Sequence, residues 1–235
     1  MRIEITIPTY NEGKIIEKNI DKLFNFLDNS KLDYNVTIAN NASKDNTLII
    51  AKKLARKYKK LIVYHTDKPG RGNALKEVWK KSKADILCYM DADLSTDLPH
   101  LNSMVELFPK YDIVLGNRLS KYSRTNRRIY RTLLSKGYNK IAKYILRIKT
   151  NDLQCGFKGI KKKVFMDIVN YTSDDNWFFD SQLIVWGEKK GYKIAEIPIK
   201  WIERKASKVK IRSTVTNYLK NLWKLRKELG KNKVI

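Results

Sequence analysis

Residues that build metal centres and disulfide frameworks are scarce in this chain. Its 235 residues include two cysteines, Cys88 and Cys155, and two histidines. The cysteines are not closely spaced and the histidines do not cluster with them, which argues against a zinc site and a disulfide framework. Because Cys88 lies within an apolar segment, we expect it in the core. Because the chain has no disulfide framework, we expect the protein in the reducing cytoplasm.

Long apolar runs are also missing. No run approaches the roughly 20 residues that a helix needs to cross a bilayer, so the sequence predicts no transmembrane segment. We expect no signal peptide either, because residues 2–8 already alternate as a core strand does. The length fits one α/β domain, which we place at residues 1–210, with a basic amphipathic helix and tail at residues 211–235.

Acidic residues are few beside basic ones. The chain has 24 Asp and Glu against 49 Lys and Arg, a formal net charge of +25. Such a surface favours anionic partners: nucleic acid, an anionic membrane or a phosphorylated substrate. Lysine-rich composition also occurs in heat-adapted proteins, so charge alone does not choose among these partners.

What the chain does have is an alternation of strand and helix patterns. Short β-rich segments at residues 2–8, 34–39, 61–64 and 86–90 are separated by segments whose apolar residues recur every three or four positions. This order predicts an α/β fold with a mainly parallel sheet flanked by helices. We expect further strands at 112–118 and 192–201, a loop at 151–158, and long helices at 124–147 and 211–229.

Two carboxylates follow the most apolar of these strands. The segment Ile86 to Met90 is followed by Asp91 and Asp93. Open α/β sheets bind ligands beyond the carboxyl ends of their strands. Two carboxylates held there repel each other unless a cation is bound, and Mg²⁺ or Mn²⁺ with a diphosphate is the natural partner. The alternative is a pair of solvated loop acids.

Two more motifs each have two interpretations. The turn Gly70-Arg71-Gly72 opens a helix and could cradle a phosphate, although an ordinary tight turn is favoured. Asp180 follows three aromatic residues, Trp177 to Phe179. A carboxylate among aromatic rings is partly desolvated and suits a general base or a substrate ligand, or else Asp180 simply caps the next helix.

Basic residues form two stripes in the predicted helices. In the 124–147 helix, one face carries Arg124, Arg128, Arg131 and Ser135, and the apolar side carries Ile129, Leu133, Tyr138, Ile141 and Ile145. The basic face is a solvated surface or a phosphate site. The C-terminal helix combines lysines with Trp223 and Tyr218, and it either packs on the core or lies on an anionic membrane.

Taken in order, these motifs resemble those of family 2 glycosyltransferases, which have the GT-A (Rossmann-like) fold. The likeness covers roughly residues 1–210 and is nearest to the dolichol-phosphate mannose synthases and dolichyl-phosphate β-glucosyltransferases. It rests on Ile7 to Glu12, Ser43 to Thr47, Gly70 to Leu75, Met90 to Asp93 and Gly116 to Arg118. The segments 152–158, 177–180 and 196–208 look more like the glucosyltransferase branch.

The resemblance implies roles for individual residues. It places the nucleotide-sugar donor at Pro8, Tyr10, Glu12, Ile38, Asn40, Asp91, Ala92, Asp93, Arg118, Ser207 and Lys208. It places the metal, Mg²⁺ or Mn²⁺, at Asp91 and Asp93, and it makes Asp93, Asp152 and Asp180 the candidate catalytic residues. The acceptor phosphate falls at Arg131 and Ser135, to which the basic stripe adds Arg128.

The implied reaction is inverting transfer of one sugar, glucose or mannose, from a UDP- or GDP-sugar to a polyprenyl (dolichyl-type) phosphate. The enzyme would be peripheral on the cytoplasmic face of an anionic membrane. Asn40 and Asn41 stand where relatives usually have two aspartates, which leaves the base open. The alternatives are transfer to a glycan on a lipid or protein, a silent donor-binding protein, or a basic nucleic-acid-binding protein. We expect no nucleic-acid partner, since the chain lacks aromatic RNA-binding motifs.

Overall fold

The computed structural model describes residues 1–204 and 211–232, with side chains described to residue 204 and from residue 217. The strands are β1 (Arg2–Thr9), β2 (Asp33–Asn41), β3 (Leu61–Thr66), β4 (Ile86–Met90), β5 (Ile113–Asn117), β6 (Arg124–Asn126), β7 (Phe157–Lys161), β8 (Ile194–Pro198) and β9 (Lys200–Ile202). The helices are α1 (Ile16–Asp28), α2 (Thr47–Lys57), α3 (Arg71–Lys81), α4 (His100–Leu107), α5 (Ile129–Leu146), α6 (Lys162–Ile168), η1 (Val169–Tyr171), α7 (Phe179–Lys189) and α8 (Ile211–Lys231).

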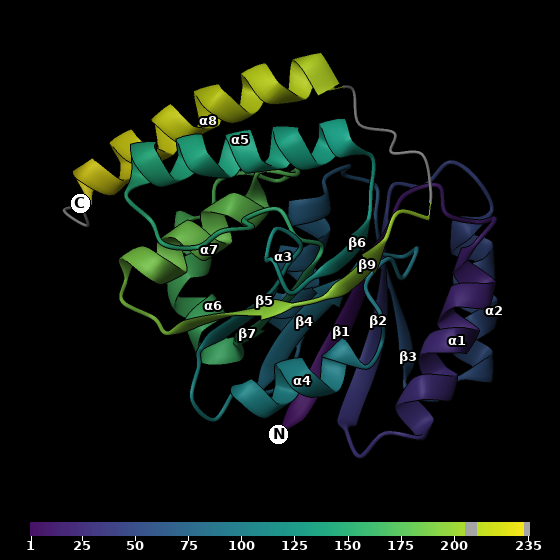
Figure 1. Cartoon of the computed structure of the whole chain (residues 1–235). Helices are drawn as coiled ribbons and strands as arrows, with labels where there is room; N and C mark the ends of the chain where they lie inside the picture. Colours follow the sequence, from purple (N-terminus) through teal and green to yellow (C-terminus); the bar gives the residue numbers. More distant parts are fainter. Residues whose placement is uncertain (205–210, 233–235) are drawn as a thin grey trace.

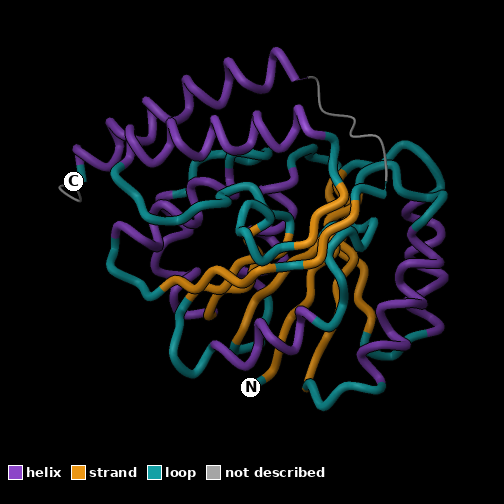
Figure 2. The backbone as a smooth tube through the Cα atoms, in the orientation of Figure 1, coloured by secondary structure: helices purple, strands orange, loops and turns teal. Residues whose placement is uncertain are grey.

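Seven strands form one sheet in the order β3-β2-β1-β4-β7-β5-β8. All neighbours are parallel except β7, which runs antiparallel to β4 and β5. The predicted mainly parallel sheet with helices on both faces is confirmed (Figures 1 and 2). The short strands β6 and β9 form a separate parallel pair.

Strand alternation divides the core between the two faces of the sheet. On β1, Ile3, Ile5 and Ile7 are buried in the cluster that includes apolar residues of α1, α2 and α4. Leu87 and Tyr89 of β4 belong to the opposite cluster, with residues of α3, α6 and α7. Successive residues of a strand point to opposite faces, and β4, buried on both, is apolar at every position, whereas β1 carries the buried polar residues Glu4 and Thr6 between its isoleucines.

The helices α5 and α8 lie side by side over the second face (Figure 1). Leu222, Leu225 and Leu229 of α8 are buried in the core cluster of that face. The ring of Tyr218 lies 5.3 Å from that of Tyr138 on α5. Of the two interpretations of the C-terminal helix, packing on the rest of the molecule is therefore what the described residues show.

Two expectations about the second half were wrong. The predicted helix at 124–147 begins only at Ile129, because residues 124–126 pair with β9 as a strand. The predicted loop at 151–158 ends in β7, which enters the middle of the sheet. Its one glycine and two lysines hide the strand pattern, yet Lys158 is 1% exposed.

The predicted strand at 192–201 is two strands. Pro198 ends β8, Ile199 is buried between them, and β9 continues in the second sheet. A proline cannot donate to a strand ladder, so the strand changes partner at this point.

Candidate functional site

The carboxyl edge of the central sheet places Asp91 and Asp93 in the loop after β4. Asp91 accepts a hydrogen bond from Arg71 Nη2 at 2.8 Å, and Asp93 Oδ1 accepts one from the backbone of Ser95 at 3.0 Å. A side chain at Gly156 would overlap the Asp91 carboxylate. The loop before β7 therefore allows the close approach that holds Asp91 in place.

Arg71, the middle residue of the Gly-Arg-Gly turn, occupies the centre of this edge. Its guanidinium lies between the rings of Tyr89 and Trp177, 4.8 and 4.7 Å from their centroids. A second nitrogen, Nη1, lies 3.8 Å from Asp180. Burial raises the pKa of Asp91, with Asp93 and Asp180 adding to the rise and Arg71 opposing it. The turn thus supplies a cation to the carboxylates rather than a simple chain reversal.

Asp180 is buried and belongs to a polar cluster that the sequence did not reveal. Its carboxylate accepts a short hydrogen bond from the Tyr89 hydroxyl, and Lys158 Nζ lies 3.5 Å from it. Lys158 also donates to Tyr89 at 3.1 Å. Burial and the Asp180 charge raise the pKa of Tyr89, so its hydroxyl keeps the proton that it donates. Of the two interpretations of Asp180, the helix cap is wrong, because Phe178 occupies the cap position of α7.

Asp152 is fully buried and is held by Arg118. The guanidinium donates to both carboxylate oxygens at 2.8 Å, and the Arg118 backbone N–H donates at 3.0 Å. Burial acts to raise the pKa of Asp152, but Arg118 outweighs it and holds the pKa below its usual value. This bidentate pair joins the end of β5 to the loop before β7.

The other predicted donor residues gather at the ends of β1 and β2. Pro8 and Asn40 lie in register-paired parts of these strands, and Tyr10 and Glu12 follow β1. Ile38 is fully buried in the core, and the carbonyl of Ala92 accepts a hydrogen bond from Asn19 at 2.8 Å. Ser207 and Lys208 lie outside the described residues.

The predicted acceptor residues are not on one helix face. Arg124 lies in β6 and Arg128 at the cap of α5. Arg131 forms a 2.8 Å ion pair with Glu203, and Ser135 is buried.

Arg127, which the sequence did not single out, donates to Ser135 at 2.9 Å and stacks over Trp201. Burial lowers the pKa of Arg127 to about 10, with Arg118 and Arg131 acting in the same direction. Its Nε is buried without a partner among the described residues. Its spacing of three residues from Arg124 and four from Arg131 could have signalled it, but nothing in the local sequence indicated that it would be buried.

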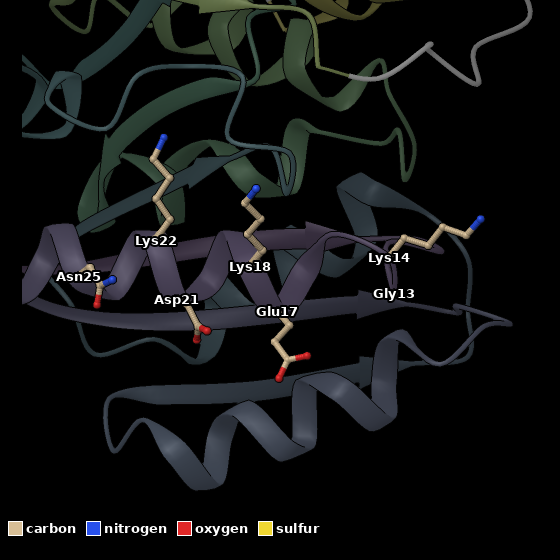
Figure 3. A pocket seen from close by; sticks show the side chains of 7 residues that line it. All are labelled: Gly13, Lys14, Glu17, Lys18, Asp21, Lys22 and Asn25. Carbon is tan, nitrogen blue, oxygen red and sulfur yellow. The ribbon is translucent and has the colours of Figure 1, made fainter.

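A groove along α1 starts beside this edge of the sheet, at Gly13 next to Glu12, and runs away from it along the helix (Figure 3). It is lined by Gly13, Lys14, Glu17, Lys18, Asp21, Lys22 and Asn25. Glu17 and Asp21 point toward α2, where they pair with Lys53 and Lys57 at 3.4 and 2.9 Å. The groove is the polar face of one helix.

A family model for glycosyl transferase family 2 matches residues 4–169. The chain belongs to this family. It is 31% identical over 216 residues to glycosyltransferase AglD of Haloferax volcanii, covering 89% of this chain and 34% of that protein. It is 26% identical to human dolichyl-phosphate beta-glucosyltransferase (88% and 69%) and 27% identical to Pyrococcus furiosus dolichol-phosphate mannosyltransferase (98% and 65%). The chain thus spans about a third to two thirds of these relatives.

Solved structures share the fold of this glycosyltransferase family member. Glucosyl-3-phosphoglycerate synthase from Mycobacterium tuberculosis, in complex with Mn²⁺, UDP and glucosyl-3-phosphoglycerate, superposes with a TM-score of 0.68 at 14% identity (95% and 78% covered). A mannosyltransferase from Pyrobaculum calidifontis, in complex with GDP-Man and Mn²⁺, superposes with a TM-score of 0.60 at 18% identity (88% and 58%). The expected family and fold class are therefore confirmed.

Proposed function

We propose that this chain transfers one hexose, glucose or mannose, from a UDP- or GDP-sugar to a polyprenyl phosphate of the dolichyl type, with inversion. The observation that carries the proposal is the carboxyl edge itself. In a chain of glycosyltransferase family 2, Asp91 and Asp93 follow the central strand beside the ends of β1 and β2. Two of the relatives are named for transfer involving dolichyl phosphate.

The residues at this edge fit a divalent cation. Among the described residues no group of three or more His, Cys, Asp or Glu could hold a metal. Mg²⁺, however, is commonly bound by one or two carboxylates together with substrate phosphates, which is the donor set that Asp91, Asp93 and a diphosphate would provide. Mg²⁺ or Mn²⁺ bound there would neutralise the leaving nucleoside diphosphate. Arg71 places a further positive charge beside Asp91.

A phosphate acceptor needs no general base from the nearby carboxylates. A phosphate monoester is already anionic near neutral pH, so it must be oriented rather than deprotonated. Its oxygen attacks the anomeric carbon from the face opposite the diphosphate, and the bond from that carbon to the diphosphate oxygen breaks as the new bond forms. Arg127, Arg128, Arg131 and Ser135 would orient the acceptor, and Asp152 would position Arg118 on the donor side.

The second candidate, transfer to a glycan hydroxyl, requires a general base. Asp180 and Asp152 are the candidates, and both carboxylates already accept hydrogen bonds from Tyr89 and Arg118 respectively. We therefore rank it below the phosphate acceptor.

The exposed side of α5 suits the lipid part of such an acceptor. Ile129, Leu133 and Tyr144 are 80%, 63% and 86% exposed, whereas the face that packs on the molecule carries Ser135 and Asn139. Exposed basic residues accompany these apolar ones: Lys136 and Lys140 lie on the same side of the helix, and Arg124 and Arg128 precede its first residue. A helix with this arrangement binds at the surface of an anionic bilayer. No described helix is long and apolar enough to span one. We place the enzyme peripherally on the cytoplasmic face.

The test is release of nucleoside diphosphate. Purified protein is given UDP-glucose or GDP-mannose with Mg²⁺ or Mn²⁺, with and without polyprenyl phosphate. We expect release only with the lipid phosphate and mainly from one donor. Asp93→Asn should lower kcat by at least about a hundredfold, since it removes charge that the metal needs, while Asp97→Asn, on the loop before α4, should change it little. Release of nucleoside diphosphate with a sugar acceptor and not with lipid phosphate would establish transfer to a glycan hydroxyl instead.

A further inference from the structure

A large aromatic ring lies half exposed beside the carboxylates of the sheet edge. Trp177 is 49% exposed, although the Arg71 guanidinium lies over one face of its ring, 4.7 Å from the centroid. Arg71 in turn donates to Asp91 at 2.8 Å, and its Nη1 lies 3.8 Å from Asp180. A single guanidinium therefore separates Trp177 from both carboxylates, and the ring face that Arg71 does not cover is open to solvent.

The segment that carries Trp177 is fixed to the start of α3 and to α7. The backbone N–H of Asn73 donates to the Asp175 carbonyl at 2.9 Å, and Asp174 Oδ1 accepts from the backbone N–H of Phe179 at 3.2 Å. The chain is thus held on both sides of Trp177. An exposed ring on a fixed backbone has little freedom left to lose when a ligand binds, which favours recognition.

The donor has a group that suits such a ring. Under the proposed function Asp91 and Asp93 bind the diphosphate side of the donor, and the hexose is bonded directly to that diphosphate. The hexose is therefore the part of the donor nearest to Arg71 and Trp177. A hexose carries its hydroxyls around the edge of the ring and C–H groups on its two faces. The face of an aromatic ring is electron-rich and attracts the weakly positive hydrogens of such C–H groups.

We propose that the open face of Trp177 is the surface on which the transferred hexose stacks, while Arg71 covers the other face. This inference rests on the proposed function. The prenyl chain of the acceptor is the second apolar group that comes to this edge. Its phosphate, however, is assigned to the residues around Arg127 and Ser135, whereas Trp177 is linked to Asp91 through Arg71. Trp177 therefore contributes to binding of the sugar and not of the nucleotide.

The substitution that isolates this role is Trp177→Leu. Leucine keeps an apolar side chain over Arg71 but removes the flat aromatic face. The dissociation constant of the nucleotide-sugar should rise about threefold to tenfold, as expected for the loss of one aromatic contact. The dissociation constant of the nucleoside diphosphate, which lacks the hexose, should stay the same. Trp177→Phe keeps a smaller ring and should give an effect between those of the wild type and the leucine variant.

The experiment is calorimetric titration of the full chain with Mg²⁺ and without acceptor. UDP is compared with UDP-glucose, and GDP with GDP-mannose. The measured quantity is the ratio of the dissociation constant of the nucleotide-sugar to that of its nucleoside diphosphate, which we expect to rise in Trp177→Leu. Trp223→Leu makes the same chemical change at a ring 56% exposed on α8, and as the matched control it should leave the ratio unchanged.

Each outcome bears on a different statement. If Trp177→Leu weakens the nucleotide-sugar and the nucleoside diphosphate by the same factor, the ring acts only through Arg71 and the stacking role is overturned, while the proposed function stands. Unchanged donor binding with a higher KM for polyprenyl phosphate would assign the ring to the acceptor instead. If the wild type binds none of the four nucleotides, the proposed function itself fails. Thermal unfolding of each variant is measured alongside, and Trp177→Met is titrated in the same way should the leucine variant not fold.

Discussion

At the scale of single residues, the buried charges depart most from what the sequence alone predicts. Asp91 and Asp93 could be recognised because they interrupt an apolar strand at its end. The partners that hold such acids could not, because Arg71 is 20 positions from Asp91 in the chain and Lys158 is 22 positions from Asp180. Only the register that puts β7 beside β4 brings Lys158 against Tyr89. Ion pairs between distant residues carry no local sequence pattern.

The Asp152–Arg118 pair gives a prediction about stability. Arg118→Met leaves a buried carboxylate without its partner, and breaking a buried pair in this way costs about 3–5 kcal/mol at pH 7. Urea unfolding at pH 7 measures the loss. Lys57→Met, which removes the more exposed pair with Asp21, is the control and should lower the free energy of unfolding far less.

The contribution of Asp152 to the free energy of unfolding should change with pH in opposite directions in the wild type and in Arg118→Met. In the wild type the folded pKa of Asp152 is lowered, so the stability from this pair is present above the ordinary carboxyl range and is lost as pH falls through the folded pKa. In Arg118→Met the pKa of the unpaired buried carboxyl rises above its unfolded value. The folded variant then binds a proton first and gains stability between pH 7 and pH 5. A parallel loss in both proteins would contradict this account.

At the scale of elements, local periodicity predicted well where strand and helix follow one another. The α3 and β4 segments show clear patterns, and both form near the expected positions. The start of α5 was misplaced because an amphipathic pattern continues through residues 124–128, and only pairing with β9, some 75 residues later, makes residues 124–126 a strand. Periodicity also predicted the wrong face: Ile129 and Leu133 are exposed, not buried.

The exposed side of α5 can be tested without disturbing the fold. Ile129→Ser with Leu133→Ser should change the free energy of unfolding by less than about 0.5 kcal/mol per site, because both side chains are already in water. Vesicle binding should weaken about tenfold or more, since apolar contact with the bilayer is lost. Co-sedimentation with vesicles containing anionic phospholipid measures it.

The control for this variant is Ile49→Ser, at a side chain 73% exposed on α2. In Figure 1, α2 lies at the opposite side of the molecule from α5. Activity toward a short, water-soluble prenyl phosphate should be unchanged in both variants. Equal vesicle binding by the α5 variant and the wild type would show that α5 does not contact the membrane.

At the scale of the whole molecule, the net charge of +25 fits several partners, and only the placement of charge beside apolar surface separates them. Non-specific binding of nucleic acid depends on phosphate contacts, so its affinity falls steeply with salt. A membrane surface that also buries Ile129 and Leu133 keeps part of its affinity when charges are screened, because apolar burial is insensitive to ionic strength.

Salt titration of the two ligands therefore distinguishes the partners. Between about 0.1 and 0.5 M NaCl, where the screening length falls from roughly 10 Å to less than half of that, binding to a duplex should be lost. Vesicle binding by the wild type should weaken and then level off. Vesicle binding by the Ile129→Ser, Leu133→Ser variant should be lost over the same salt range in which duplex binding is lost. Binding to RNA that outlasts vesicle binding at the higher salt would make nucleic acid the partner of this surface, because charge alone could not sustain it.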